Sequence, residues 1–271
     1  MNINFSKLTA AGNDFILIDN RNNEILENEY EFLAKKLCNR KYSIGADGLI
    51  LVERSSYKDF KMKYLNSDGS HASMCGNGGR SVARFAYDLG VVDSKMVFET
   101  DAGFVNAEIL PQNNVRLGLY DPKDIKLNMR VDVEAKEFNI DFINTGVEHV
   151  VIFVDDIENI DVLKYGKIIR YHKIFAPKGT NVNFVKVVSN NTLFVRTYER
   201  GVEDETLACG TGITASGIIS VIKNFVKSPV SVVARGGDML SVSSNIMGGC
   251  KVTNVVLEGP AVVVFKGMID I

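Results

Sequence analysis

Two short segments with the same pattern contain the residues most suited to chemistry. "SMCGNGGR" (residues 73–80) and "LACGTGIT" (207–214) each place a cysteine directly before a glycine, a small polar residue and another glycine. A helix is predicted to follow each segment. Glycines let the backbone point free N–H groups at one spot, and the helix dipole adds positive potential there. Each segment is therefore predicted to bind an anionic group such as a carboxylate, and to favour the thiolate form of its cysteine, Cys75 or Cys209.

Two such thiols suit the inversion of a carbon centre. If they face each other, one thiolate removes a proton from one face of the carbon, and the other thiol delivers a proton to the opposite face. The substrate's α-carboxylate would lie between the two helix N-termini, whose dipoles stabilise the charge that moves onto it as the α-proton leaves. Cys75 and Cys209 are then expected to exchange the roles of acid and base with the direction of the reaction.

A metal site or a nucleotide site would account for fewer of these residues. Zinc sites usually bring four ligands, often closely spaced, but the chain has only three histidines and no C-x-x-C, so we expect no metal. Residues 210–215 fit the loose pattern G-x-G-x-x-A, yet the acidic residue that a dinucleotide site needs about 20 positions later is missing. A phosphate-binding loop in one copy, or a glycine turn with a buried cysteine, would not account for the repetition.

The two segments belong to a longer internal repeat. Four landmarks recur at a constant offset of 134 positions: Cys75 and Cys209, Gly12 and Gly146, Gly45 and Gly179, Tyr64 and Tyr198. This offset is too long for a solenoid repeat, and 271 residues are enough for two cores. We therefore expect an N-terminal half (1–120) and a C-terminal half (121–259), joined within the proline-containing stretch 120–128. The last strand, 260–271, is expected to return to the first half.

Each half is predicted to run from a strand through a helix and two further strands to its cysteine segment, and then into a second helix. The expected strands are 7–18, 49–52 and 60–65, then 141–154, 182–188 and 193–198; the expected helices are 29–39 and 81–89, then 162–169 and 213–226. Asn28 and Glu31 are placed as a capping-box pair for the first helix. The last helix is apolar nearly all round, Phe225 included, so it should be buried and wrapped by strands.

Composition and charge exclude several classes of protein. Apolar residues make up 46% and charged residues 24%, as in ordinary globular proteins. With 31 basic and 33 acidic residues and no long run of one sign, nothing indicates a nucleic-acid surface. The apolar runs are too short to cross a membrane, and the N-terminus lacks an apolar signal core, so we expect a cytoplasmic protein with reduced thiols. Cys38 and Cys250 are then expected to be small buried hydrophobes.

Three motifs resemble those of the diaminopimelate epimerase family. The family's early G-N-D-F segment corresponds to "AGNDFILID" here. Its signature N-x-D-G-S-x-x-x-M-C-G-N-G-x-R corresponds in full to "NSDGSHASMCGNGGR" (66–80), and its E-R-G…E-T-x-A-C-G-T/S-G to "ERGVEDETLACGTG" (199–212). Collinear matches run from Lys7 to the C-terminal "VVFKG" and so cover nearly the whole chain. The two long signatures are highly specific.

The resemblance implies an α/β (α+β) fold of two pseudo-symmetric domains, each a β-barrel-like sheet around a central helix, with the active site between them. It implies a cofactor-independent enzyme that interconverts LL- and meso-diaminopimelate, on the route to lysine and peptidoglycan. Cys75 and Cys209 would be the acid/base thiols, and His149 and Glu199 would tune their pKa values. The implied substrate-binding residues are Gly76, Asn77, Gly210 and Thr211 at the α-carboxylate, with Asn13, Asn66, Asn181, Glu199 and Arg200 elsewhere. A homodimer and a small-molecule substrate complete the expectation.

Arg200 also has a physical interpretation of its own. A guanidinium suits a distal carboxylate held by two parallel hydrogen bonds, and the alternative is a surface salt bridge. Three positions depart from the family: Ala10 replaces a glycine, Gly48 replaces a glutamine, and Val147-Glu148-His149 replaces N-P-H, which removes an asparagine that would contact substrate.

Because the cysteine signatures are intact, the reaction type is more secure than the substrate. A related cofactor-independent racemase of another amino acid is therefore the alternative function. A thiol-based sensor without catalysis would exchange no α-proton on any amino acid. A racemase dependent on pyridoxal phosphate would need a Schiff-base lysine and a phosphate cup, and neither stands out in the sequence.

Overall fold

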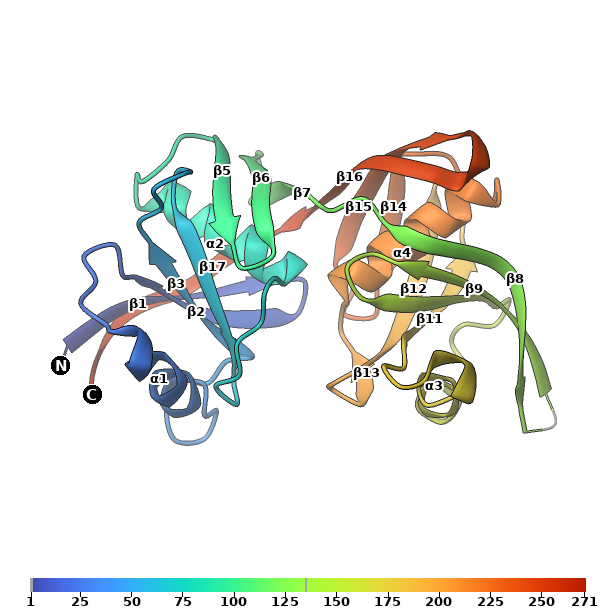
Figure 1. Cartoon of the computed structure of the whole chain (residues 1–271), viewed down its shortest axis with the longest axis horizontal. Coiled ribbons are helices and arrows are strands. Elements are labelled where there is room, and N and C mark those ends of the chain that lie inside the picture. Colours follow the sequence, from blue (N-terminus) through green and yellow to red (C-terminus); the bar gives the residue numbers. More distant parts are fainter. Residues whose placement is uncertain (1, 135) are drawn as a thin grey trace. The chain divides into compact units, whose positions relative to one another are not determined.

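The computed structural model describes residues 2–134 and 136–271, which form two compact units. The first unit extends to Gly118 and includes the C-terminal segment Glu258–Ile271, and the second is Leu119–Leu257 (Figure 1). The C-terminal segment joins the first unit because β17 (Val262–Asp270) pairs antiparallel with β1 (Asn2–Ala10). Both units mix strands and helices.

The first unit is a sheet wrapped around one central helix, α2 (Gly76–Asp88). From β17 and β1 the strands continue in chain order through β2 (Asn13–Asp19), β3 (Gly48–Glu53), β4 (Lys61–Asn66), β5 (Lys95–Thr100), β6 (Gly103–Ile109) and β7 (Asn114–Gly118). The β2–β3 and β4–β5 pairs are parallel and the others antiparallel. Helix α2 contacts β1, β2, β3, β6, β7 and β17, while α1 (Tyr30–Leu37) contacts β3 and β4.

The second unit repeats this topology. Its strands are β8 (Lys123–Val133), β9 (Lys136–Asn144), β10 (Glu148–Phe153), β11 (Asn181–Val187), β12 (Thr192–Glu199), β13 (Asp204–Thr206), β14 (Val230–Ala234), β15 (Met239–Met247) and most of β16 (Lys251–Pro260). Strands β9, β10, β11, β12, β14 and β15 correspond to β1–β6, because the β10–β11 and β12–β14 pairs are parallel and the rest antiparallel. Helices α3 (Val162–Arg170) and α4 (Gly210–Ile222) correspond to α1 and α2. The predicted repeat and fold class are confirmed.

Two glycine landmarks of the repeat have a steric origin. Gly45 and Gly179 both adopt left-handed backbone conformations, with φ of +75° and +68°. A Cβ atom on Gly45 would lie 2.7 Å from the Cα of Arg40, and one on Gly179 would lie 2.7 Å from the carbonyl oxygen of Arg170. In each unit, therefore, only glycine fits where the chain turns from the helix into the next strand.

The central helix α4 is buried together with its hydroxyl groups. Its apolar residues include Ile213, Ala215, Ile218 and Ile219, each no more than 1% exposed. Thr214, Ser216 and Ser220 each donate a hydrogen bond to the carbonyl four residues earlier, at 2.8, 2.8 and 2.7 Å. The helix can be buried on all sides because these polar groups are satisfied within it.

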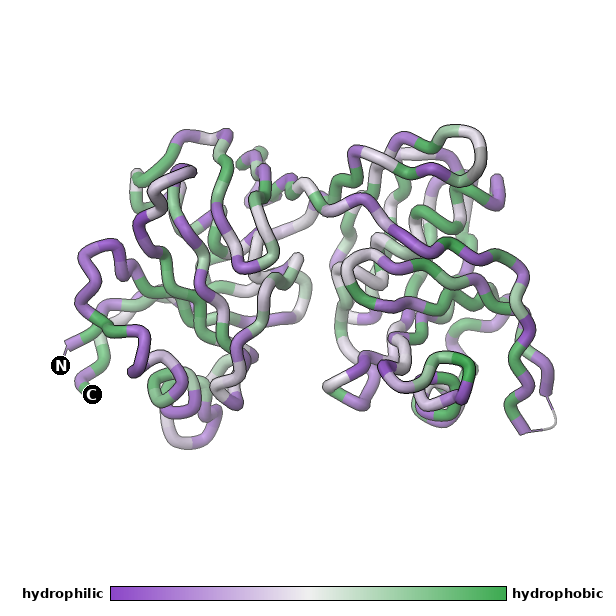
Figure 2. The backbone as a smooth tube through the Cα atoms, in the orientation of Figure 1, coloured by the Kyte–Doolittle hydropathy of each residue, from purple (hydrophilic) through white to green (hydrophobic). Residues whose placement is uncertain are grey.

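The backbone hydropathy follows the same division between core and surface. Figure 2 shows hydrophobic and hydrophilic stretches alternating along the strands, as expected for sheets with one face on a central helix. No helix formed by the described residues is long and apolar enough to cross a membrane.

Several predicted boundaries were wrong. The strand predicted at 7–18 is the hairpin β1–β2, which turns at Ala11 and Gly12 with positive φ, and the strand predicted at 141–154 is β9 and β10. Helices α2 and α4 begin at Gly76 and Gly210, three to five residues earlier than predicted, because the glycines belong to the first turn.

Three further local predictions were also wrong. Asn224 adopts φ +59° directly after α4, so Phe225 lies outside the helix and is 43% exposed. The first helix is not capped by Asn28 and Glu31: the Glu29 carboxylate accepts from the Leu26 N–H, at the start of a 3-10 turn (Glu27–Glu29) that precedes α1. Cys250 is half-buried, at φ +61° in the 3-10 turn Gly248–Cys250, whereas Cys38 is buried as predicted.

Candidate active site

Cys75 is the N-cap residue of α2 in the first unit. Its backbone is extended, with φ −137° and ψ 127°, and its Sγ accepts from the Gly78 N–H at 3.5 Å. The segment turns directly into the helix at Gly76, so the first backbone N–H groups lie next to the thiol. Because a helix leaves these N–H groups without intrahelical partners, the position can bind an anion beside the sulfur.

A chain of side-chain hydrogen bonds orients Asn77 in the first turn of α2. Arg80, which is fully buried, donates through Nη2 to Asn77 Oδ1 at 2.8 Å. Asn77 Nδ2 donates to Asn13 Oδ1 at 2.5 Å, and Asn13 Nδ2 donates to Asp47 Oδ2 at 2.9 Å. Two predicted substrate-binding residues, Asn13 and Asn77, thus bond directly to each other, and each is also held by a residue that was not predicted, Asp47 or Arg80.

Cys209 is the N-cap residue of α4 in the second unit. Its backbone is extended, with φ −113° and ψ 107°, and the residue is 6% exposed. Its Sγ lies 3.5 Å from Thr211 Oγ1. The following Gly212 has no room for a side chain, because a Cβ atom there would clash with Asn183 Oδ1. Cys209 therefore occupies, in its own unit, the position that Cys75 occupies in the other.

Asn183 fixes the protonation state of the predicted site residue His149. Asn183 Nδ2 donates to the Val150 carbonyl at 2.8 Å and lies 3.2 Å from His149 Nδ1, while Oδ1 accepts from Thr197 Oγ1 at 2.9 Å. The carbonyl of Val150 can only accept, so the amide nitrogen must face it, and the same nitrogen then faces His149. His149 Nδ1 is therefore the acceptor, and the neutral ring carries its proton on Nε2.

The other ring nitrogen of His149 is a buried donor. Burial, followed by the charge of Arg200, lowers the pKa of His149 to about 3. Its Nε2 is buried and has no hydrogen-bond partner among the described residues. Leaving a buried N–H unpaired costs about 1–3 kcal/mol, so such a donor is typical of a site that a bound ligand completes.

The His149 tautomer can be measured by NMR. Long-range ¹H–¹⁵N spectra should show His149 as a neutral ring protonated at Nε2, without titration between about pH 5 and 8. The near-isosteric change Asn183→Asp replaces the donor facing Nδ1 with an acceptor, so it should move a proton to Nδ1. His71→Gln and His172→Gln variants assign the signals. A wild-type ring protonated at Nδ1 would contradict the arrangement.

Arg200 follows the end of β12 and is tied to β10 and β11. Its Nη1 donates to Glu148 Oε2 at 2.8 Å, and its backbone N–H donates to Asn181 Oδ1 at 2.8 Å. Asn181 Nδ2 donates in turn to the Glu148 carbonyl at 2.9 Å. Asn181 and Arg200, both predicted substrate contacts, thus meet around Glu148.

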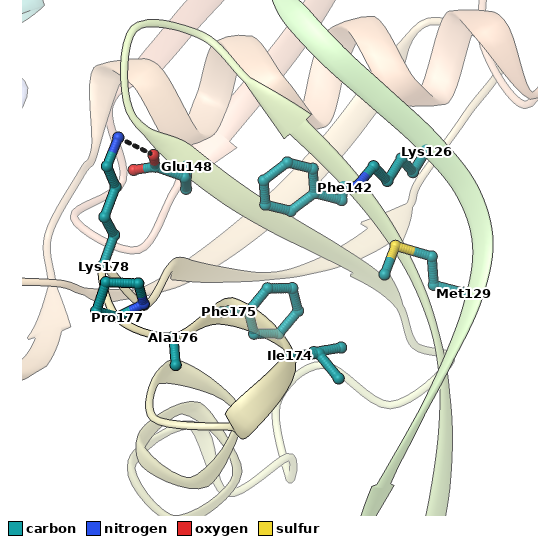
Figure 3. A pocket seen from close by; sticks show the side chains of 10 residues that line it. Lys126, Met129, Phe142, Glu148, Ile174, Phe175, Ala176, Pro177 and Lys178 are labelled. Carbon is teal, nitrogen blue, oxygen red and sulfur yellow. Dashed lines mark ion pairs between the residues drawn. The ribbon is translucent and has the colours of Figure 1, made fainter.

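Glu148 also borders a pocket of about 220 Å³ in the second unit (Figure 3). On this side Lys178 Nζ lies 3.5 Å from Glu148 Oε1. The stacked rings of Phe142 and Phe175, with centroids 5.9 Å apart, form part of the apolar lining. Glu148 therefore lies between two cations, Arg200 and Lys178.

The remaining predicted residues have other partners within their units. Asn66, the last residue of β4, donates through Nδ2 to Ser70 Oγ at 2.9 Å. Glu199, the last residue of β12, accepts through Oε2 from Thr206 Oγ1 at 2.9 Å. Among the described residues, no group of three His, Cys, Asp or Glu side chains could hold a metal ion.

Sequence reasoning missed Asn183 and the contact partner Glu148. Asn183 had one usable signal: it is a polar residue inside the apolar strand "VNFV", and a buried polar side chain needs partners. In the sequence, Glu148 is visible only as a departure from the family motif N-P-H. Its ion pair with Arg200 cannot be predicted from a local pattern, because it joins residues 52 positions apart.

Known proteins match this chain over nearly its full length. A family model described as "Diaminopimelate epimerase" matches residues 5–121 and 142–264. Diaminopimelate epimerases from Hydrogenobaculum sp. (strain Y04AAS1) and Aquifex aeolicus (strain VF5) are each 44% identical to this chain. They cover 98% of it, and the matches span 98% and 97% of those proteins.

Solved structures with low sequence identity share the fold. A PhzF-family phenazine biosynthesis protein from Bacillus anthracis has a TM-score of 0.74 at 16% identity, with full coverage of both chains. A hydroxyproline epimerase from Agrobacterium vitis has a TM-score of 0.72 at 14% identity, covering 99% of this chain and 92% of that one. The family match along most of the sequence, on a fold that places each motif cysteine at a helix N-terminus, shows that the chain belongs to the diaminopimelate epimerase family.

Proposed function

We propose that this protein is a cofactor-independent epimerase that interconverts LL- and meso-diaminopimelate, with Cys75 and Cys209 as its acid and base. One observation carries the proposal: the two cysteines are the N-cap residues of equivalent helices in two units of the same topology. Family membership supplies the substrate.

The proposed reaction needs both helix N-termini at one substrate. The α-carboxylate accepts hydrogen bonds from the backbone at Gly76 and Asn77 and at Gly210 and Thr211. One thiolate takes the α-proton, the negative charge moves towards the carboxylate, and the opposite thiol protonates the other face of the carbon. The second thiol ends as a thiolate and the first as a thiol, so the enzyme is ready for the reverse direction.

In this proposal, neutral His149 and Glu199 tune the pKa of Cys209, the cysteine in the same unit. The Nε2–H of His149 can donate a hydrogen bond to a developing anion. Because the ring is neutral, it adds no full positive charge that would hold Cys209 as a thiolate, so this thiol can still return its proton. Glu199 is the expected counterpart that limits thiolate formation, since a nearby negative charge disfavours a second one.

The distal end of the substrate is assigned to Arg200, with Asn13, Asn66 and Asn181 as further polar contacts. A guanidinium binds a carboxylate through two parallel hydrogen bonds and so distinguishes a dicarboxylic substrate from a monocarboxylic one. Arg200 is 23% exposed in its side chain, which leaves it accessible to a ligand.

The proposal includes a cytoplasmic homodimer. A reducing compartment suits an enzyme whose acid and base are thiols, because oxidation would remove both at once. Analytical ultracentrifugation across a range of protein concentrations would measure the oligomeric state, and a monomer at all concentrations would contradict this part.

The substrate can be tested without any assumption about mechanism. Purified protein is incubated in D₂O, without cofactor, with a panel of amino acids that includes LL- and meso-diaminopimelate and proline. We expect fast loss of the α-proton NMR signal for diaminopimelate, and at most slow loss for amino acids without the distal carboxylate, such as lysine. Exchange on another amino acid alone would favour the related racemase, and exchange on none would favour a non-catalytic thiol protein.

A further inference from the structure

Arg200 is held through one of its two terminal nitrogens. Nη1 donates to Glu148 Oε2 at 2.8 Å and to the backbone carbonyls of Lys178 and Gly179 at 3.3 and 3.4 Å. These are the side-chain hydrogen bonds that Arg200 makes to described residues, and all three use Nη1. A guanidinium has five N–H donors in a planar fork, so the edge formed by Nε and Nη2 stays open for a second, bidentate partner.

Glu148 is rigidly placed to hold Nη1. Its strand position is clamped by Asn181, which accepts from the Arg200 N–H and donates to the Glu148 carbonyl. Burial would raise the pKa of Glu148, but a backbone hydrogen bond and the Arg200 guanidinium outweigh burial and lower it, so the carboxylate is ionised. The side chains of Glu148 and Arg200 are 16% and 23% exposed, which sets this pair apart from a mobile surface ion pair.

The charges around Glu148 leave the cluster attractive to an anion. Lys178 Nζ lies 3.5 Å from Glu148 Oε1 (Figure 3), whereas Arg200 Nη1 donates to the other oxygen, Oε2. Arg200, Glu148 and Lys178 together carry a net charge of +1. Glu148 can therefore orient the guanidinium without cancelling the positive potential that a substrate carboxylate needs.

We propose that Glu148 is a positioning residue that determines substrate specificity, because it fixes Arg200 through Nη1 and presents the Nε–Nη2 edge to the distal carboxylate of the substrate. This inference rests on the proposed function. Glu148 stands where the family motif N-P-H has proline, which has no side-chain acceptor, so the arrangement belongs to this chain rather than to the motif. The opposite role, in which Glu148 competes with the substrate for Arg200, predicts an effect of opposite sign.

The test compares Glu148→Ala and Glu148→Gln with the control Glu137→Ala, which removes an exposed ion pair with Arg130 in the same unit and leaves the cluster around Arg200 untouched. For diaminopimelate, Glu148→Ala should raise KM about tenfold with kcat changed less than about twofold, as expected when binding alone is lost. Glu148→Gln, which keeps an acceptor for Nη1, should raise KM about threefold, and Glu137→Ala should resemble wild type.

A second readout separates orientation of Arg200 from general damage. Lysine lacks the distal carboxylate of diaminopimelate, so its slow α-proton exchange in D₂O should be the same in wild type and in the Glu148 variants. Unchanged or lowered KM values for diaminopimelate in both Glu148 variants would overturn the inference. If Glu148→Ala does not fold, as judged by its thermal unfolding, Glu148→Gln decides the question. Wild-type protein that leaves diaminopimelate unchanged would instead refute the proposed function.

Discussion

Replacement of either Cys75 or Cys209 by alanine is expected to lower kcat/KM for diaminopimelate epimerisation by about a thousandfold or more. Each direction of the proposed reaction needs one thiolate as base and one thiol as acid, so neither cysteine can replace the other. Both are the N-cap residues of central helices, and neither Cys38 nor Cys250 precedes a Gly-polar-Gly segment. Cys38→Ala is the matched control, because burial raises the pKa of the Cys38 thiol to about 12 and so makes it inert.

Solvent deuterium distinguishes the two-thiol mechanism from a single-base mechanism. In D₂O, early product should carry deuterium at the inverted carbon, while recovered substrate stays largely protiated, because the proton just removed remains on the other cysteine. A single alanine variant should still eliminate a leaving group from a β-halogenated analogue if its remaining thiolate reaches the α-proton. Substantial epimerisation by either variant, or early product without deuterium, would exclude the mechanism.

The change Arg200→Ala is expected to lower kcat/KM for diaminopimelate about a hundredfold, as for loss of one partner from a buried charge pair. The variant removes both the open Nε–Nη2 edge and the positive charge that balances Glu148. The fold should persist, because Glu148 keeps Lys178 within 3.5 Å and Asn181 still bonds the Glu148 carbonyl. Steady-state kinetics in both directions, with thermal unfolding as the check on folding, measure the effect.

Arg200→Lys is the informative companion variant. Lysine keeps the charge but cannot present two parallel donors, so it should recover only part of the lost kcat/KM. α-Proton exchange on lysine, which has no distal carboxylate, should hardly respond to either change. Wild-type kcat/KM for diaminopimelate in Arg200→Ala would show that another residue anchors the distal end, and full activity of Arg200→Lys would argue against bidentate binding.

Local patterns were enough to predict the repeat and the position of both cysteines. Gly45 and Gly179 recur because a left-handed turn with no room for a Cβ allows only one residue type, so the constraint is visible in the sequence itself. The same holds for the glycines after Cys75 and Cys209, which form the first turn of each helix. The burial of α4 also follows from its composition, because an apolar residue on every side leaves no face for water.

Element boundaries depended on contacts that a local pattern does not contain. The apolar periodicity of residues 7–18 continues through the turn at Ala11 and Gly12, so the sequence pattern does not show the hairpin. The pairing of β1 with β2 and β17 defines it. The left-handed Asn224 ends α4 before Phe225, although the apolar pattern runs on. The position of such a turn depends on how the segments on either side of it pack.

The electrostatics of the site were decided by tertiary structure alone. His149 and Asn183 come from adjacent parallel strands separated in the chain by α3, and only that pairing places the amide nitrogen against Nδ1 and fixes the tautomer. Glu148 and Arg200 meet only because β10, β11 and β12 lie side by side. A sequence states which groups can ionise or donate, but their protonation state and orientation depend on burial and on partners that the fold brings together from distant positions.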